Sequence, residues 1–520
     1  MCGILVSSST QKSFDKSAKK IISRGPDQQD KLVGKNYQFY FNRLAIMDLH
    51  PTGMQPFYDD EIIVSANAEI YNEKYLKTLV TYDFKSSSDC EVLLPLYKKM
   101  GLSMFKMLDA EFACVIYDKR SGEMIAARDP IGIRPLFYGY LKSDNKIIFA
   151  SEAKAIISDV EKVYPFPIGH YYIKGEFIAY TEILAPITFL KDTHEVIFKE
   201  IEERLNKAVI KRLQSDAPIG FLLSGGLDSS LVCAIAKKHM TKPMHTFSIG
   251  MDSDPIDLKY AKQVSNYLGT IHHEIRMSKE DVLSSLDNVI YALESFDITT
   301  VRASIGMYLI CKYIREHTHI KVLLTGEVSD ELFGYKYTDF APSPKDFQQD
   351  AEKRLQELYK YDVLRADRCL AAHALEARVP FGDIDFVSYV MKIDPKYKMN
   401  TYDMGKYLLR KAFEKDYLPK DILYRQKAAF SDAVGHSMVD ILKAYANKYY
   451  TDEAFENKKK KYKPIPFTKE ALLYREIFEK HYPDHGHLIQ DYWMPNQMWE
   501  GCNVSDPSAR YLKNYGKSGE

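Results

Sequence analysis

The feature that most constrains the fold is an apolar run that ends in a glycine turn. Residues 219–223 are all apolar or glycine, Ser224-Gly225-Gly226 follows them, and a helical pattern covers residues 229–238. Glycines let a backbone come close to a phosphate, and the N–H groups that open a helix bind anions. The turn lacks the Gly-Lys-Ser/Thr ending of a P-loop and the GxGxxG spacing of dinucleotide sites. The sequence therefore predicts a buried strand, a phosphate-binding turn and a helix.

Further strands and helices alternate around this turn. Residues 244–249 and 321–324 are short apolar runs. A long amphipathic helix is predicted from Thr193, because apolar residues recur there at steps of four: Ile197, Ile201, Leu205 and Val209. Buried strands that alternate with helices indicate a parallel α/β sheet.

The part before about residue 185 has a different pattern. Strands are predicted at residues 3–6, 62–66, 112–117, 124–127, 136–141 and 147–150, with turn residues between several of them and a helix at 91–99. Such a succession favours antiparallel sheets. Because 520 residues exceed what one hydrophobic core normally holds, we expect two domains, at 1–188 and 193–520.

Charge and cysteine usage exclude several classes of protein. Lys plus Arg number 71 and Asp plus Glu number 71, which argues against a general affinity for nucleic acid or anionic membranes. The seven cysteines form no CxxC pair, as expected for reduced thiols. The N-terminus has no apolar signal region, and no run approaches the roughly 20 apolar residues of a membrane span. We expect a cytoplasmic protein.

Cys2 is the first candidate for chemistry. If Met1 is removed, Cys2 becomes the first residue, and its α-amino group, with a pKa of about 8, can act as the base for its thiol. A small residue at position 2 is common, so the position alone decides nothing. Four later segments add to it: residues 23–27 (SRGPD), 43–48 (RLAIMD), 67–72 (NAEIYN) and 88–91 (SDCE).

Together, Cys2 and these segments resemble the glutaminase domain of class II, N-terminal-nucleophile amidotransferases, whose motifs are CGI, RGPD, RLSI.D, NGEIYN and SD.E. The resemblance implies an αββα sandwich in which Cys2 forms a γ-glutamyl thioester. It puts the Asn67 side chain and the Ala68 N–H in the oxyanion hole. It also implies a glutamine-binding set, with Arg43 on the α-carboxylate and Asp89 on the α-ammonium: Arg43, Leu44, Ala45, Ile46, Met47, Asn67, Ala68, Glu69 and Asp89.

Two positions depart from the family pattern. Ala68 stands where the family has glycine, so its N–H can donate correctly only if an alanine can adopt the required backbone angles. Ser23 stands where histidine is common. A slow or damaged glutaminase is therefore one alternative.

The second half of the chain resembles the asparagine synthetases. The SGGLDS turn is similar to the pyrophosphate loop of ATP pyrophosphatases (adenine nucleotide α-hydrolase-like), and residues 325–334 look like the segment SGEGSDE.FGGY. The resemblance implies an α/β fold with extra helices, Mg²⁺ held by Asp228 and Asp330, and Glu327 at the acyl-adenylate. The implied ATP-binding residues are Leu222, Ser224, Gly225, Gly226, Asp228, Ser229, Ile249, Thr325 and Gly326.

Other segments point to aspartate as the second substrate. Residues 297–304 resemble the pattern TT.RAS, which implies that Arg302 anchors the aspartate carboxylate. Asp362 and Arg365, residues 376–381 and residues 424–432 match further segments. Lys427, in the last of these, is implied to neutralise charge during adenylyl transfer. Val328 and Ala428 replace a family glycine and glutamate, and bulk at Val328 either narrows the aspartate pocket or points to solvent.

The implied activity converts aspartate, glutamine, ATP and water into asparagine, glutamate, AMP and pyrophosphate. ATP is a substrate and Mg²⁺ the cofactor; no nucleic acid or membrane partner is expected, and a homodimer is compatible with the sequence. The implied catalytic residues are Cys2, Asn67, Ala68, Glu327 and Lys427. Three alternatives stay open: a related amide ligase of the β-lactam synthetase type, an ammonia-only synthetase, and a non-catalytic ligand-sensing protein. His272-His273-Glu274 lacks the spacing of a helical zinc site and is interpreted as structural.

Overall fold

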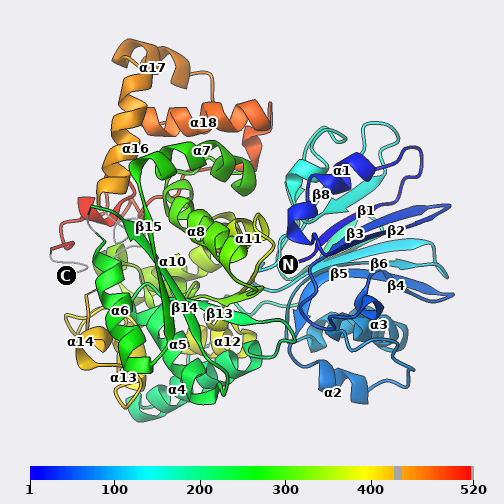
Figure 1. Cartoon of the computed structure of the whole chain (residues 1–520), viewed down its shortest axis with the longest axis horizontal. Helices are drawn as coiled ribbons and strands as arrows, with labels where there is room; N and C mark the ends of the chain where they lie inside the picture. Colours follow the sequence, from blue (N-terminus) through cyan, green and yellow to red (C-terminus); the bar gives the residue numbers. More distant parts are fainter. Residues whose placement is uncertain (187, 254, 427–435, 517–520) are drawn as a thin grey trace.

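The first part of the chain forms two antiparallel sheets that face each other (Figure 1). The computed structural model describes residues 1–186, 188–253, 255–426 and 436–516. One sheet has the order β10-β8-β9-β1-β3-β2 and the other β12-β11-β7-β6-β5-β4. Their bounds are β1 Gly3–Ser7, β2 Gln28–Gly34, β3 Tyr37–Arg43, β4 Phe57–Tyr58, β5 Ile62–Ile70, β6 Ala110–Asp118, β7 Glu123–Arg128, β8 Phe137–Tyr140, β9 Ile147–Ala150, β10 Tyr164–Pro165, β11 His170–Ile173 and β12 Glu176–Ala179.

The strand period of two assigns each side chain to a layer. On β1, Ile4 and Val6 face the core between the sheets, whereas Leu5 faces the outer layer beneath α1 (Asp15–Lys19). On β5, Ile63 faces the same inner core, and its neighbours pack against α3 (Leu93–Met100) on the other outer side. Helices thus cover both outer faces, and the predicted αββα sandwich is confirmed.

A five-stranded parallel sheet organises the second part of the chain. Its order is β15-β14-β13-β16-β17, with β13 Ile219–Leu222, β14 His245–Met251, β15 Ile271–Met277, β16 Val322–Leu324 and β17 Glu376–Arg378. The apolar runs predicted as strands are β13, β14 and β16. β14 and β15 follow β13 on one side, whereas β16 and β17 lie on its other side. A sheet in which the strand order reverses in this way has a crevice at the carboxyl ends of the strands next to the reversal.

Helices cover both faces of this sheet. One face packs against α4 (His194–Arg212), which Thr193 precedes as predicted, α5 (Leu227–His239), α6 (Ile256–Leu268) and α12 (Ile384–Lys392). The other packs against α7 (Lys279–Leu293), α8 (Ile298–His317) and α11 (Asp362–Ala371). The remaining α-helices are α2 (Glu73–Thr78), α9 (Ser329–Phe333), α10 (Pro344–Glu357), α13 (Tyr407–Ala412), α14 (Lys420–Leu423), α16 (His436–Tyr449), α17 (Asp452–Lys459) and α18 (Lys469–His481).

Buried ion pairs join the sandwich to the parallel sheet. Arg24 donates to both oxygens of Asp367, at 2.7 and 3.0 Å. Arg378, on β17, lies 2.8 Å from Glu69 on β5. All four side chains are buried. Within the described ranges, no helix is long and apolar enough to span a bilayer.

Candidate active sites

Cys2 and Asn67 meet where β1 begins and β5 passes. The Cys2 N–H donates to Asn67 Oδ1 at 3.0 Å, and the thiol donates to the Leu44 carbonyl over 3.7 Å. Arg24 fixes the same residue from the other side, since its Nε donates to the Cys2 carbonyl at 3.0 Å. Cys2 is therefore held by three separate segments of chain, through its N–H, its carbonyl and its thiol.

The side-chain amide of Asn67 has a donor to spare. Asn67 is 1% exposed, and its Nδ2 has no hydrogen-bond partner among the described residues. A buried amide donor is rarely left unpaired, and an oxyanion hole requires such a donor beside the nucleophile. Because Oδ1 is bound to Cys2, the orientation of Nδ2 is fixed in advance.

Ala68 occupies regular strand geometry. It pairs with Phe112 across the β5–β6 ladder and is not one of the residues with positive φ. An alanine can adopt this conformation without strain, because only the left-handed region favours glycine. The departure from the family glycine therefore leaves the backbone donor intact.

Met1 determines the state of the Cys2 thiol. Burial raises the pKa of this thiol, and the nearby amino terminus only partly offsets that rise. Met1 is itself buried, its amino group lies 3.7 Å from Glu376 Oε2, and burial lowers the pKa of that amino group to about 6. While Met1 is present, the nitrogen of Cys2 is an amide and cannot act as a base, so an activated nucleophile requires the removal of Met1.

The other predicted glutamine-binding residues form two groups. The first consists of Arg43 and Asp89, whose polar side chains are hydrogen-bonded within the sandwich. Arg43 donates to Gln28 Oε1 at 2.7 Å and to the His50 carbonyl at 2.6 Å, and Asp89 accepts from the Ile70 N–H at 2.7 Å. Burial raises the pKa of Asp89 to about 6.

The second group faces the parallel-sheet part of the chain. Leu44 and Ile46 are buried in the core that also contains Phe221 and Leu324, and Met47 packs against it. Ala45 donates its N–H to Asp27 at 2.9 Å, and Glu69 pairs with Arg378. The residues at 44 and 46 can therefore reach a ligand through their backbone and not through their side chains.

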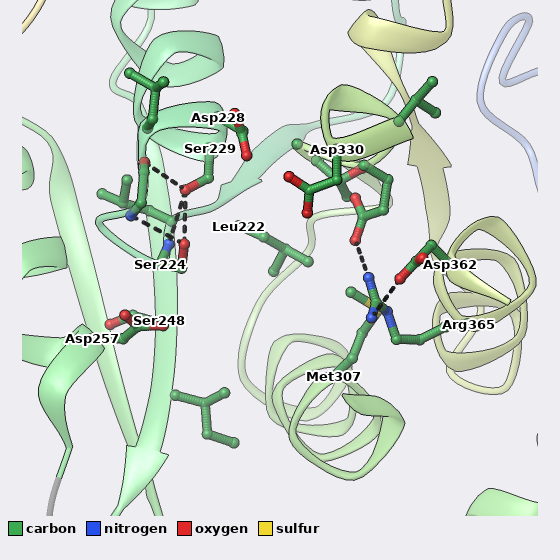
Figure 2. Close-up of a pocket in the computed structure, with 18 of the residues that line it drawn as sticks. Leu222, Ser224, Asp228, Ser229, Ser248, Asp257, Met307, Asp330, Asp362 and Arg365 are labelled. Carbon is green, nitrogen blue, oxygen red and sulfur yellow. Dashed lines mark hydrogen bonds and ion pairs between the residues drawn. The ribbon is translucent and has the colours of Figure 1, made fainter. Parts of the chain in front are cut away.

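A second pocket opens at the carboxyl ends of β13, β14 and β16 (Figure 2). The Ser224–Ser229 turn lies on one side, where the Ser224 and Ser229 hydroxyls are 3.0 Å apart and the Ser224 Oγ accepts from the Gly226 N–H at 3.2 Å. Gly225 has φ +73°, and a Cβ there would lie 2.4 Å from the Ala261 nitrogen. Both facts require glycine. Leu222, Ile249, Thr325 and Gly326 also line the pocket, and their contact with a nucleotide stays a prediction.

Asp228 and Asp330 are brought together at one end of this pocket. The Lys406 ammonium lies 2.7 Å from Asp228 Oδ2 and 2.5 Å from Asp330 Oδ1. Burial opposes its charge, yet the two carboxylates outweigh burial, so the pKa of Lys406 lies above its ordinary value. The Lys406 ammonium shows that a cation can lie between these two carboxylates. The pair also suits Mg²⁺, which takes one or two carboxylates plus phosphate oxygens. Among the described residues, no cluster of three or more His, Cys, Asp and Glu side chains could hold a metal.

Sequence reasoning missed Lys406. It lies 178 positions from Asp228, and no motif surrounds it, so only the fold could identify it. Lys427, the lysine that was predicted, lies outside the described residues.

Glu327 also lines the pocket. Its Oε1 accepts from Arg365 Nη2 at 3.3 Å, and Arg365 Nη1 is 3.0 Å from Asp362 (Figure 2). Burial, together with Asp362 and Asp330, raises the pKa of the neighbouring Glu331 to about 8. Near neutral pH this carboxyl is therefore largely protonated, and it adds little charge to the site.

Arg302 is held by carboxylates of the protein itself. It lines an adjoining pocket that shares Asp330, Asp362 and Arg365 with the first. Its guanidinium pairs with both oxygens of Glu470 and both of Asp506, at 2.6–3.1 Å. Four of its five N–H donors are thus used within the protein, and it is 2% exposed. It shapes the pocket wall, and its contact with the aspartate carboxylate stays a prediction.

The structure also places Val328 and His272. Val328 is 1% exposed and lines the pocket at the strand ends, so it does not point to solvent. His272 lies on β15, where Thr246 and Ser248 contact its ring nitrogens at 2.9 and 3.1 Å. Burial lowers the pKa of His272 to about 4. This is a neutral, hydrogen-bonded histidine, as the structural interpretation predicted.

Comparison with known proteins covers nearly the whole chain. Residues 1–207 match the model of the glutamine amidotransferase domain, and residues 200–347 and 339–505 match that of asparagine synthase. The chain is 38% identical to a maize (Zea mays) protein named asparagine synthetase [glutamine-hydrolyzing], over 99% of the chain and 94% of that protein. It is 41% identical to the protein of the same name from Cricetulus griseus, over 96% of each chain. It is also 41% identical to asparagine synthetase [glutamine-hydrolyzing] 3 from Arabidopsis thaliana, over 93% of this chain and 88% of that protein.

Proposed function

The chain belongs to the glutamine-hydrolysing asparagine synthetases, and on that premise we propose how its residues divide the reaction. The enzyme forms asparagine from aspartate, with glutamine as the nitrogen donor and ATP as the activating substrate. We assign glutamine hydrolysis to residues 1–188 and the ATP- and aspartate-dependent steps to residues 193–520.

In the glutaminase half, Cys2 attacks the side-chain amide of glutamine once Met1 is removed. The new α-amino group of Cys2 takes the thiol proton, and the carbonyl carbon forms a bond to sulfur. Asn67 Nδ2 and the Ala68 N–H stabilise the oxyanion, and ammonia leaves with the transferred proton. Water then releases glutamate from the thioester. Arg43 and Asp89 hold the α-carboxylate and α-ammonium of glutamine.

In the synthetase half, the Ser224–Ser229 turn holds the phosphates, because it leads into the N-terminus of α5, and the N–H groups at a helix N-terminus bind anions. Asp228 and Asp330 would hold Mg²⁺, which would neutralise charge on the leaving pyrophosphate. The aspartate β-carboxylate attacks the α-phosphorus and pyrophosphate departs. Lys427 supports that step by the family resemblance alone. Ammonia then attacks the β-aspartyl carbon, AMP leaves, and Glu327 accepts the proton.

Aspartate fits the adjoining pocket. That pocket meets the nucleotide pocket at Asp330, Asp362 and Arg365, so a β-carboxylate placed there can reach the α-phosphate. Arg302 supports it indirectly, since it ties helix α18 and the Asp506 segment to its wall.

The remaining expectations are extensions of the same proposal. Seven free cysteines fit a reducing compartment, so we place the enzyme in the cytoplasm. We propose only small-molecule substrates as partners, together with assembly as a homodimer, and neither nucleic acid nor membrane binding.

The observation that carries the proposal is that Asn67 Nδ2, beside Cys2, has no hydrogen-bond partner among the described residues. The same chain also contains the Ser224–Ser229 turn and the carboxylate pair of Asp228 and Asp330. The test incubates the protein with Mg-ATP, aspartate and either glutamine or ammonium, and measures asparagine and pyrophosphate. Absence of product with both nitrogen sources would refute it. Cys2→Ala should lose glutamine use and keep ammonium use; equal loss of both would contradict the division of labour.

A further inference from the structure

Lys406 forms a complete tripod of contacts inside the nucleotide pocket. Its ammonium donates to Asp228 Oδ2 at 2.7 Å and to Ser329 Oγ at 2.9 Å, and lies 2.5 Å from Asp330 Oδ1. The Ser329 hydroxyl in turn donates to Asp228 Oδ1 at 2.8 Å. An ammonium has three N–H donors, and all three are used on groups at the predicted metal site.

The position of Lys406 is held at a cost. Its side chain is 4% exposed, and its backbone has φ +58°, in the left-handed region that non-glycine residues seldom occupy. Such conformations persist where the surroundings enforce them, and they gather at functional sites. Arg410, which lines the same pocket, directs its guanidinium to the Gly405 and Leu423 carbonyls instead. Among the described residues, Lys406 is thus a direct cationic partner of both carboxylates.

We propose that Lys406 is a built-in counter-cation that fills the metal position of the nucleotide-free enzyme, so that a divalent cation enters only together with ATP. The inference rests on the proposed assignment of Asp228 and Asp330 as metal ligands. It goes beyond that assignment because it states when the metal can bind and which residue controls it.

Simple electrostatics supports this order of binding. A metal within about 2.1 Å of the two carboxylate oxygens would adjoin the ammonium that already bridges them. Two cations at that separation repel strongly, and the repulsion is largest in a buried site. ATP removes the conflict, because its phosphate oxygens supply new acceptors for the ammonium and further ligands for the metal. Lys406 then leaves the carboxylates to the metal.

The test measures Mn²⁺ binding to the nucleotide-free protein from the electron paramagnetic resonance signal of free Mn²⁺. Lys406→Met should bind Mn²⁺ about tenfold more tightly than the unaltered protein, because the carboxylates lose their internal cation. Lys406→Arg, which keeps the charge, should bind as weakly as the unaltered protein. Lys411→Met is the matched control: it removes a lysine from α13, the helix that Lys406 precedes, where the side chain pairs with Glu414 near the surface, and it should change nothing.

Each outcome bears on the proposal separately from the activity. Equal or weaker Mn²⁺ binding by Lys406→Met would overturn it, and so would equal tightening by Lys411→Met. Adding Asp228→Asn to Lys406→Met should restore weak binding, which ties the effect to this site. Circular dichroism checks folding, and Lys406→Gln takes the place of Lys406→Met if that variant does not fold. Because the measurement needs no substrate, an absence of asparagine synthesis would refute the proposed function and leave this result standing.

Discussion

At Val328, the ordinary stability advantage of an alanine variant over a glycine variant should disappear. Val328 has φ +79° and ψ −19°, a left-handed conformation, although it is β-branched and buried. Left-handed geometry costs an ordinary residue roughly 1–2 kcal/mol, and glycine avoids that cost. The strain and the buried methyl groups therefore act on stability in opposite directions.

The magnitudes decide which variant is more stable. Val328→Ala removes two methyl groups, about 1.6 kcal/mol of burial at roughly 0.8 kcal/mol each, and keeps the left-handed strain. Val328→Gly loses one more buried carbon, about 0.8 kcal/mol, and gains chain entropy when unfolded, a cost of about 0.5–1 kcal/mol, but it releases the roughly 1–2 kcal/mol of strain. Val328→Gly should therefore match Val328→Ala to within about 0.8 kcal/mol.

Urea unfolding followed by circular dichroism measures this order, with Val363 as the matched control. Val363 is buried in the same hydrophobic core but lies within helix α11, where glycine is about 1 kcal/mol worse than alanine. Val363→Gly should thus unfold at lower urea than Val363→Ala. If the two positions show the same order, with glycine clearly worse at 328 as well, the strain argument is refuted.

Three further changes test other parts of the structure. Asn67→Ala should lower glutamine-dependent asparagine formation about 100- to 1,000-fold and leave the ammonium-dependent rate within about twofold; equal loss of both rates would contradict an oxyanion role. Burial lowers the pKa of Lys398 to about 7, so the unfolded chain binds more protons above pH 7. Stability should rise from pH 7 to 9 by about 1 kcal/mol per pH unit relative to Lys398→Met; a parallel profile for the two proteins would rule this out. Arg302→Lys should raise the KM for aspartate about tenfold through a disturbed pocket wall with a smaller change for ATP; an unchanged aspartate KM would count against that wall.

Much of the fold could be predicted because its signals are local. The strand–turn–helix around Ser224 is fixed by neighbouring residues, and the alternation on β1 and β5 assigns each side chain to a layer. Cys2 and Asn67 also belong to short motifs, and the structure brings them to 3.0 Å. In each case the residues that determine the geometry are close in the sequence or share one repeating pattern.

The ionic partners could not be predicted, because the fold alone selects them. Arg302 was assigned to a substrate from its own segment, yet Glu470 and Asp506, 168 and 204 positions away, occupy its guanidinium. A buried arginine must find carboxylates, but nothing in its neighbourhood says which ones. The same holds for Lys406, whose partner Asp228 comes from another element.

These buried pairs also limit how far the two halves can act as separate modules. The Thr325 N–H, in the proposed nucleotide pocket, donates to the Arg378 carbonyl at 3.1 Å, and the Arg378 guanidinium lies 2.8 Å from Glu69, next to Ala68 of the proposed oxyanion hole. One residue thus contacts both sites. Separating the halves would leave Arg378 and Glu69 without each other, and breaking a buried ion pair typically costs about 3–5 kcal/mol. The two halves that meet near residue 190 therefore stabilise each other. The geometry of β5, which carries Asn67 and Ala68, depends on the parallel sheet, whose strand β13 precedes the Ser224–Ser229 turn.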